Sequence, residues 1–203
     1  TQAINEGLPD TLNKHRDEAI QKFDQWGIPG KGEEKYKYTD LMRAFGKLYG
    51  YAFKAPKTTV DPETIFKCAV PDLDTHTVIL ENGWYYEKNN EHLGLPENIV
   101  LVSLREAIKT HPDIIEKYYN KLAGETDEST TVLNTAFAQD GYFIYINDGV
   151  VLEKPLQVIN VLRGSNPMLV NPRNLIVAGK NSQVKVIICD HPLSHQNFLS
   201  NTV

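Results

Sequence analysis

The stretch QDGYFIYINDGVVLEKPLQVINV, residues 139–161, decides the fold class, and RNLIVAGKNSQVKVIICD at residues 173–190 continues its pattern. After Gly141, short apolar runs alternate with Asn, Asp, Gly and Pro, which favour turns between strands. The apolar runs span residues 142–146, 150–152, 158–162, 168–170, 175–178, 184–188 and 198–199. This pattern predicts many short β-strands at nearly regular spacing, from residue 142 to the end of the sequence.

Two architectures fit such a series of strands. One is an antiparallel sandwich or barrel, and the other is a parallel β-helix, whose coils stack over a common core. A half-exposed antiparallel strand alternates apolar and polar residues, but residues 175–178 do not alternate, and residues 184–188 do so only at their start. Uninterrupted apolar runs are typical of strands covered on both faces. The periodicity alone leaves both architectures open, because no clean repeat is visible.

Length and composition are those of a globular protein. The chain has 203 residues, of which 41% are hydrophobic and 23% charged, and its formal net charge is −5. This acidic balance argues against a dedicated nucleic-acid binder, and no apolar window is long enough to span a membrane. The 2 cysteines, Cys68 and Cys189, form no Cys-x-x-Cys motif. We therefore expect a cytoplasmic protein without a disulfide framework.

Residues 1–128 are predicted to be mostly helical. A first helix begins near Asp10, carries an apolar stripe at helical spacing, and ends at Gly27. A second, short helix follows Asp40 as its N-cap. Further helices are predicted at residues 103–110, 112–123 and 131–138, and a strand at 99–102.

A small hairpin is predicted at residues 76–86, because Asn82-Gly83 accepts the positive φ angles of a tight turn. The polar segment 125–129 is the predicted boundary between the N-terminal region, 1–128, and a β-rich core, 129–203.

The sharpest candidate for chemistry is Cys189-Asp190-His191, with His195 four residues further on. If Cys189 and His191 lie on one strand, they share a face and offer two ligands for zinc or an iron–sulfur cluster. A Cys–His nucleophilic pair is a second reading. We favour a third, in which Cys189 is a core residue and residues 190–192 form a turn, because two ligands do not complete a tetrahedral site.

Other polar residues form weaker candidates. Asp140, Asp148 and Glu153 resemble the paired carboxylates of a glycosidase, but Asp is also common in turns. Basic and aromatic residues are mixed in a loop that Glu33 and Glu34 make less basic, and a solvent-exposed loop is favoured there; these residues are Lys31, Lys35, Tyr36, Lys37 and Tyr38. The remaining histidines are expected at the surface; these are His15, His76, His92 and His111. We predict no catalytic, cofactor-binding or metal-binding residue.

Four stretches resemble the SufB/SufD family of iron–sulfur cluster assembly proteins. They are the two quoted above, together with WGIPGKGEEKYKYTDL at residues 26–41 and LNTAFAQDG at residues 133–141. The resemblance covers nearly the whole chain, in order, and residues 26–41 favour the SufD branch over the SufB branch.

The resemblance implies an α+β protein with a mainly β core: an N-terminal helical region followed by a right-handed parallel β-helix. Because family members are about twice as long, the chain is expected to be an N-terminal half, truncated within the β-helix. The implied role is that of a non-catalytic scaffold subunit that works with a SufB-like paralogue and a SufC-like ATPase. No position matches the family's cluster-assembly Cys and His motifs, so no functional residue is carried over.

Two further expectations remain open. The exposed edge of the last coil predicts a possible homodimer, since unpaired strand edges favour association. The rival function is a β-helix enzyme acting on carbohydrate, which would need carboxylates and a base such as Arg163 or Arg173 along one groove.

Overall fold

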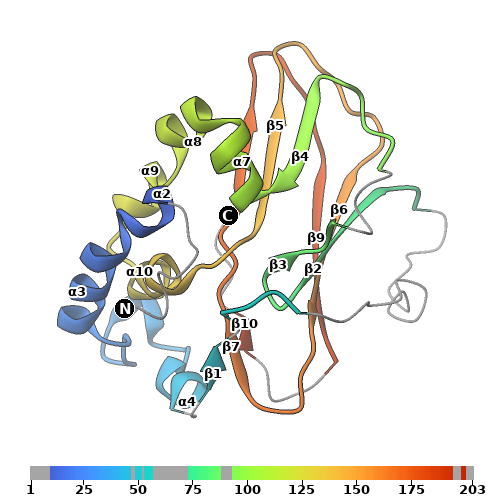
Figure 1. Ribbon diagram of the computed structural model, residues 1–203. Helices are drawn as coiled ribbons and strands as arrows, with labels where there is room; N and C mark the ends of the chain where they lie inside the picture. The colour runs from blue at the N-terminus through green and yellow to red at the C-terminus, as the bar shows by residue number, and fades with distance from the viewer. Residues whose placement is uncertain are drawn as a thin grey trace.

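The computed structural model describes residues 10–46, 49–51, 53–56, 73–87, 93–193 and 198–199. The helices gather on one side of a tall stack of strands (Figure 1). They are α2 (Asp10–Asn13), α3 (Arg16–Trp26), α4 (Leu41–Phe45), α7 (Leu104–Thr110), α8 (Pro112–Tyr118), α9 (Lys121–Gly124) and α10 (Ser129–Phe137), with a 3-10 turn, η1, at Glu34–Tyr36.

The strands after residue 141 visit three sheets in a fixed order, twice. They are β5 (Tyr142–Ile146), β6 (Leu156–Leu162), β7 (Met168–Val170), β8 (Leu175–Ala178), β9 (Val186–Pro192) and β10 (Phe198–Leu199). β5 pairs with β8, β6 with β9 and β7 with β10, and all three ladders are parallel. Each circuit of the chain therefore returns to the strand that it formed one circuit earlier, so that Leu156 lies opposite Val186.

These parallel ladders count against one of the two architectures that the sequence left open, the antiparallel one. An antiparallel sandwich is wrong for β5 to β10, because neighbouring strands of a sandwich run in opposite directions. Every residue of β6 is buried, as expected for a strand covered on both faces.

Strands from the N-terminal region cover one edge of each sheet. β1 (Gly50–Tyr51) pairs with β7, β2 (His76–Glu81) pairs with β6, and β4 (Ile99–Ser103) pairs with β5. In each sheet the N-terminal strand lies on the side opposite the later strand. Three ladders thus cross the boundary predicted at 128/129, and this edge of the stack is protected from pairing with other chains.

The predicted hairpin is confirmed. β2 and β3 (Trp84–Tyr85) are joined by Asn82 and Gly83, whose φ angles are 50° and 81°. Asn82 also ties the turn to the end of β6: its amide accepts from the Arg163 main-chain N–H at 2.9 Å and donates to the Arg163 carbonyl at 2.8 Å. The Asn-Gly pair therefore both permits the turn and fixes it to the stack.

Two predicted helices are interrupted. The first is divided into α2 and α3 at Lys14-His15, although it ends at Gly27 as predicted, with φ 66°. The helix predicted at 112–123 breaks at Asn120, which takes the left-handed φ of 59°. Asp40 caps α4 as predicted, accepting from the Arg43 N–H at 3.0 Å. Most of residues 47–70, where the sequence shows no clear helix or strand period, lie outside the described residues.

Two clusters of apolar side chains form most of the core, and β5 contributes to both. Tyr142, Ile144 and Ile146 face the inside of the stack, where β2 and β6 supply further apolar side chains. Phe143 faces the opposite way, toward Leu104 of α7 and Ile115 of α8. This alternation follows from the two-residue period of a strand, and it fixes the helices against the sheet that contains β5.

Candidate functional site

Helix α10 lies between the N-terminal helices and the strand stack (Figure 1). Ala19 of α3 packs against Val132 and Ala136 of α10. Arg16, which is fully buried, donates from Nη1 to the Ala136 carbonyl at 2.6 Å and from Nη2 to the Ala138 carbonyl at 2.8 Å. The guanidinium thus satisfies carbonyl groups that the helix end leaves without partners, and its charge suits the negative end of the helix.

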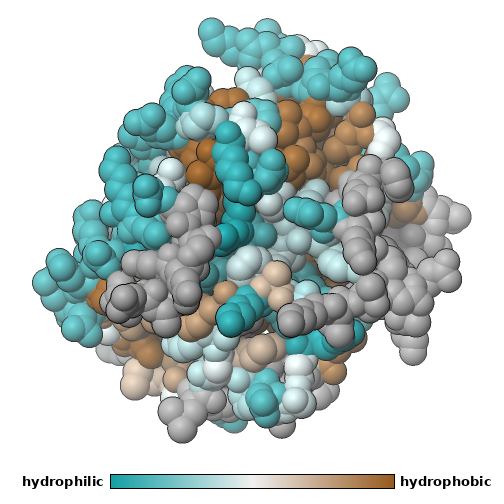
Figure 2. Space-filling view, viewed as in Figure 1, coloured by the Kyte–Doolittle hydropathy of each residue, from teal (hydrophilic) through white to brown (hydrophobic). Residues whose placement is uncertain are grey.

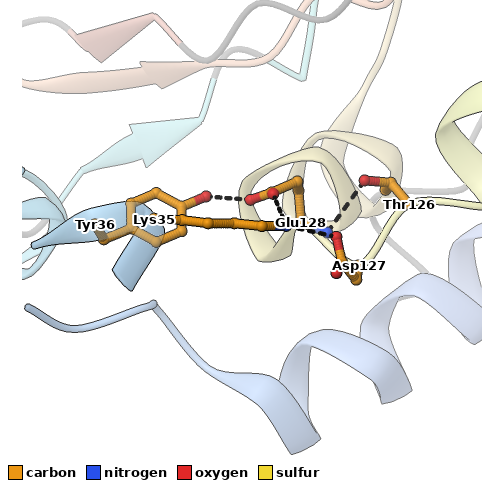
Figure 3. Close-up of polar contacts among 5 residues, drawn as sticks. All are labelled: Lys35, Tyr36, Thr126, Asp127 and Glu128. Carbon is orange, nitrogen blue, oxygen red and sulfur yellow. Dashed lines mark hydrogen bonds and ion pairs between the residues drawn. The ribbon is translucent and has the colours of Figure 1, made fainter. Parts of the chain in front are cut away.

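The other end of α10 is held by a polar cluster, which we term the Lys35–Glu128 latch (Figure 3). Lys35 Nζ lies 3.0 Å from Asp127 Oδ1 and 2.7 Å from Glu128 Oε1, and the Tyr36 hydroxyl donates to Glu128 Oε2. Thr126 completes the turn by accepting from the Glu128 N–H at 3.1 Å. The Lys35 ammonium lowers the pKa of both carboxyl groups, and the latch joins residues 26–41 to the start of α10.

A third set of contacts joins α10 to the stack. Asn134 donates from its amide to the Pro172 carbonyl at 2.8 Å, and Arg173 Nη2 donates to Thr135 Oγ1. Gly141 passes so close to Arg173 that a Cβ there would lie 1.8 Å from the Arg173 carbonyl oxygen. Only glycine fits at this position, because a side-chain atom needs about twice that separation.

Asp140 anchors three segments at once. Its carboxylate accepts from the main-chain N–H of Tyr85 and of Arg105, both at 3.2 Å, which fixes the hairpin and the first turn of α7 to the start of β5. The side chain is almost fully buried, and burial raises the pKa of Asp140 to about 6, although the main-chain hydrogen bonds oppose this shift.

The two short motifs of the family resemblance, at residues 26–41 and 133–141, are therefore brought together at α10. We term this region, formed by Arg16, the Lys35–Glu128 latch, Asn134, Asp140 and Arg173, the α10 junction. Its side chains bond mainly to main-chain groups and to each other, which is an arrangement that positions secondary-structure elements. This is the role expected of a structural connector between the helices and the strand stack.

The turn predicted at residues 190–192 is wrong, because Asp190, His191 and Pro192 continue the strand that contains Cys189. All three belong to strand β9, because Asn160 and Val161 of β6 continue the ladder opposite Asp190 and His191. Cys189 is a free thiol that packs against apolar side chains of β2 and β6, but it is only partly buried, at the margin of the predicted core.

The neighbouring polar contacts of β9 are structural. Gln157 Nε2 donates to Cys189 Sγ at 3.6 Å, and Asn160 donates to Asp190 at 2.8 Å. Within the described residues, no group of three or more His, Cys, Asp or Glu side chains is arranged to hold a metal ion. His195 lies outside those residues.

The candidate carboxylates are not brought together. Asp140 precedes β5 and Asp148 follows it, and Asp148 accepts from the Lys180 N–H at 2.7 Å. Glu153 is exposed on the turn after β5. Arg163 lies 3.6 Å from Glu81, whereas Arg173 is buried beside α10, so the two arginines do not share a groove.

The basic loop is not a free cationic surface. Lys31 pairs with Asp40 at 3.0 Å, Lys35 belongs to the latch, and Lys37 lies over the Tyr38 ring at 5.6 Å. The histidines predicted at the surface are half-buried where the structure describes them, at positions 15, 76 and 111, while His92 falls outside.

Sequence reasoning missed Arg16 and did not predict that Arg173, named only as a candidate base, is buried. A signal existed for Arg16, because it follows Leu12 by four residues and precedes Ala19 by three, which places it on the apolar face of the helix. Arg173 follows Asn171-Pro172 in a turn, and nothing in the local pattern marks it as buried.

The far edge of the stack, formed by β8, β9 and β10, is a second candidate site. Among the described residues each of these strands has one strand neighbour. Ile188 is 42% exposed, whereas Val158, its partner on β6, and Val78, the partner of Val158 on β2, are 0% exposed. This edge offers unpaired main-chain groups and an apolar side chain to another strand.

The helices of the described segments are too short or too polar to cross a lipid bilayer. Hydrophilic side chains also dominate the surface over the helices (Figure 2).

Comparison with known proteins identifies the family. Residues 1–158 match the model of the SufBD protein N-terminal region. An iron–sulfur cluster assembly SufBD family protein of Mycobacterium tuberculosis is 24% identical over 191 residues, covering 88% of this chain and 22% of the relative. The iron–sulfur cluster assembly protein SufD of Bacillus subtilis is 30% identical over 102 residues, and SufB of the same organism is 31% identical over 108 residues.

The last two matches cover 47% and 53% of this chain, and each covers 23% of the relative, so each matched segment spans less than a quarter of the relative's length. The family model covers more than half of the chain and includes both motifs that meet at α10. The chain therefore belongs to the SufB/SufD family of iron–sulfur cluster assembly proteins.

Proposed function

We propose that this chain is part of a SufD-like scaffold subunit of an iron–sulfur cluster assembly complex, and that it performs no reaction of its own. The match of residues 1–158 to the SufBD N-terminal region carries this proposal. The match to SufB is as good as the match to SufD, so the SufD assignment rests on residues 26–41 alone.

We further propose that β5 to β10 are the first coils of a right-handed parallel β-helix. Three parallel ladders visited in a repeating order support this fold. Connections between parallel strands of one sheet are right-handed in nearly all proteins, which supports the proposed hand.

In this proposal the N-terminal region has two tasks. Its strands β1, β2 and β4 cover one edge of the stack, and the α10 junction holds its helices against the same stack. Partners are a SufB-like paralogue and a SufC-like ATPase, and the compartment is the cytoplasm, which the free thiol of Cys189 supports. No observation favours the carbohydrate-active alternative, since its candidate carboxylates and arginines are dispersed.

The test is co-purification of the full-length protein, tagged at its C-terminus, with the products of its neighbouring genes. We expect an ATPase and a paralogue to be recovered together with the tagged protein. Recovery of the protein alone, at several ionic strengths, would contradict the proposed complex.

A matched pair of variants links the complex to the α10 junction. Gly141→Ala places a methyl group against the Arg173 carbonyl, whereas Gly32→Ala meets no atom within 4 Å. If the junction positions the scaffold, Gly141→Ala reduces recovery of the partners and Gly32→Ala does not. Equal recovery of the partners with both variants would show that assembly of the complex does not depend on the junction.

A further inference from the structure

A polar pocket of about 330 Å³ lies beside the α10 junction, between α3, α9 and α10. Lys14, His15, Tyr119 and Lys121 are among its lining residues. A second hollow, of about 660 Å³, shares four lining residues with the first: Lys14, His15, Glu116 and Tyr119. The two hollows thus meet at the interruption between α2 and α3, which the sequence did not predict.

A buried positive charge lies behind the floor of this pocket. Arg173 is 3% exposed, and its Nη2 donates to Thr135 Oγ1 and, at 2.9 Å, to Asn120 Oδ1, two side chains that line the pocket. Its Nε and Nη1 find no acceptor among the described residues, and no carboxylate there pairs with it. A buried guanidinium without an anionic partner is costly, so the site favours a negative charge nearby.

A second guanidinium reinforces this field. Arg16 is fully buried and donates to two carbonyl groups of the α10 end, without a carboxylate partner in the described part of the chain. Tyr119 interacts with both cations, and Arg173 lies 5.9 Å from the centre of its ring.

The mouth of the pocket carries charges of both signs. Lys14 and Lys121 are exposed, and neither forms an ion pair with another described residue. Glu18 is paired with Lys22 at 3.2 Å, which leaves Glu116 and Glu125 as the negative charges of the lining. Two unpaired lysines of the lining, Lys14 and Lys121, are thus matched by two carboxylates. The excess positive charge of the site comes from Arg16 and Arg173, which are buried outside the lining.

The pKa of the half-buried His15 depends on these charges. Burial lowers the pKa of its imidazole, and the positive charges of Lys14, Arg173 and Lys121 lower it further, against the opposing charge of Glu18. An anion placed in the pocket would reverse part of this effect, because an opposite charge favours the protonated imidazole.

We propose that this pocket binds a small oxyanion, a phosphate or carboxylate group, between Lys14 and Lys121, over the polar floor formed by Asn120 and Thr135. Ammonium groups contribute charge-assisted hydrogen bonds at the mouth, and the Arg173 guanidinium contributes its charge from behind the floor. The proposal is independent of the proposed scaffold function, since it concerns residues of this chain alone.

The test is titration of the full-length protein, purified alone, with inorganic phosphate and in parallel with citrate, against chloride at constant ionic strength. We expect saturable binding of at least one of the two oxyanions, with a Kd of about 1 mM or lower by calorimetry. Tighter binding of phosphate or of citrate assigns the phosphate or the carboxylate class. No saturable binding of either overturns the proposal.

Matched variants locate the binding. Lys14→Gln/Lys121→Gln should weaken binding at least about tenfold, because two charge-assisted contacts are lost. Lys37→Gln/Lys180→Gln removes the same charge from residues outside the pocket lining and should leave the Kd unchanged. Equal weakening by both pairs would indicate non-specific charge attraction and contradict the site.

The His15 imidazole supplies a second readout that needs no variant. Its resonances should titrate at a higher pH in saturating oxyanion than in chloride. An unchanged His15 titration in the presence of bound anion would place the anion elsewhere and overturn the proposal.

Discussion

Arg16 Nη1 lies 2.6 Å from the carbonyl oxygen of Ala136, although 120 residues separate them in the chain. This contact joins the first long helix to the end of α10. It closes the N-terminal helices against the strand stack, because α10 is itself bonded to Pro172 and Arg173.

Arg16→Leu should therefore destabilise the protein. The substitution removes both donors from the carbonyls of Ala136 and Ala138, and we expect a loss of about 1–3 kcal/mol in the free energy of unfolding. Chemical denaturation measures it. Arg43→Leu, on an exposed position of α4, is the control, and a similar loss in both variants would refute a specific role for Arg16.

Tyr36→Phe should loosen the Lys35–Glu128 latch. It removes the hydroxyl that donates to Glu128, and we expect amide exchange in η1 to accelerate about 2- to 10-fold, equivalent to one hydrogen bond. Tyr38→Phe is the matched control, because the Tyr38 ring is 91% exposed. Unchanged exchange in Tyr36→Phe would show that the hydroxyl does not hold the latch.

The latch should also open in acid. Lys35 lowers the pKa of Asp127 and of Glu128, so their ionised forms stabilise the folded state above the pKa of the unfolded chain. This contribution is lost as the pH falls through the lowered pKa values of the folded state. In that acidic pH range, amide hydrogen exchange in η1 should therefore accelerate in the wild type. It should change less in Lys35→Gln.

The contribution of Asp140 to the free energy of unfolding should have the opposite dependence on pH. Burial raises its pKa to about 6, so the folded state binds a proton that the unfolded state has already released. Its contribution to stability is full below the unfolded pKa and declines as the pH rises to about 6. The wild type should show this decline in unfolding free energy and Asp140→Asn should lack it; identical slopes would contradict the assignment.

Gly141→Ala should destabilise the protein strongly. A Cβ at this position would lie 1.8 Å from the Arg173 carbonyl oxygen, so the main chain must move, and we expect a cost above about 3 kcal/mol. Gly32→Ala, which meets no neighbour within 4 Å, should be nearly neutral. Thermal unfolding of both variants provides the measurement.

Much of the local structure was predictable from short sequence signals. Asn82-Gly83 predicted the hairpin, Gly27 the end of α3 and Asp40 the cap of α4, because each depends on the conformational or hydrogen-bonding preference of one or two residues. The runs at 142–146, 168–170 and 175–178 matched strands β5, β7 and β8.

The candidate site was less predictable. The motifs at 26–41 and 133–141 were recognised, but their meeting at α10 was not. A short motif carries no information about a partner about 90 residues away in the chain. Asp140 was noticed as a carboxylate, and its role as an anchor of the hairpin and α7 depends on main-chain groups that only the fold brings near.

The sequence by itself determined where strands, turns and caps form, since those depend on neighbours a few residues away. Only the tertiary structure decided that the ladders are parallel, that β9 continues through His191, and that Arg16 and Arg173 are buried beside α10. The physical reason is that strand pairing and burial are set by contacts between distant segments, and the local pattern of residues does not encode them.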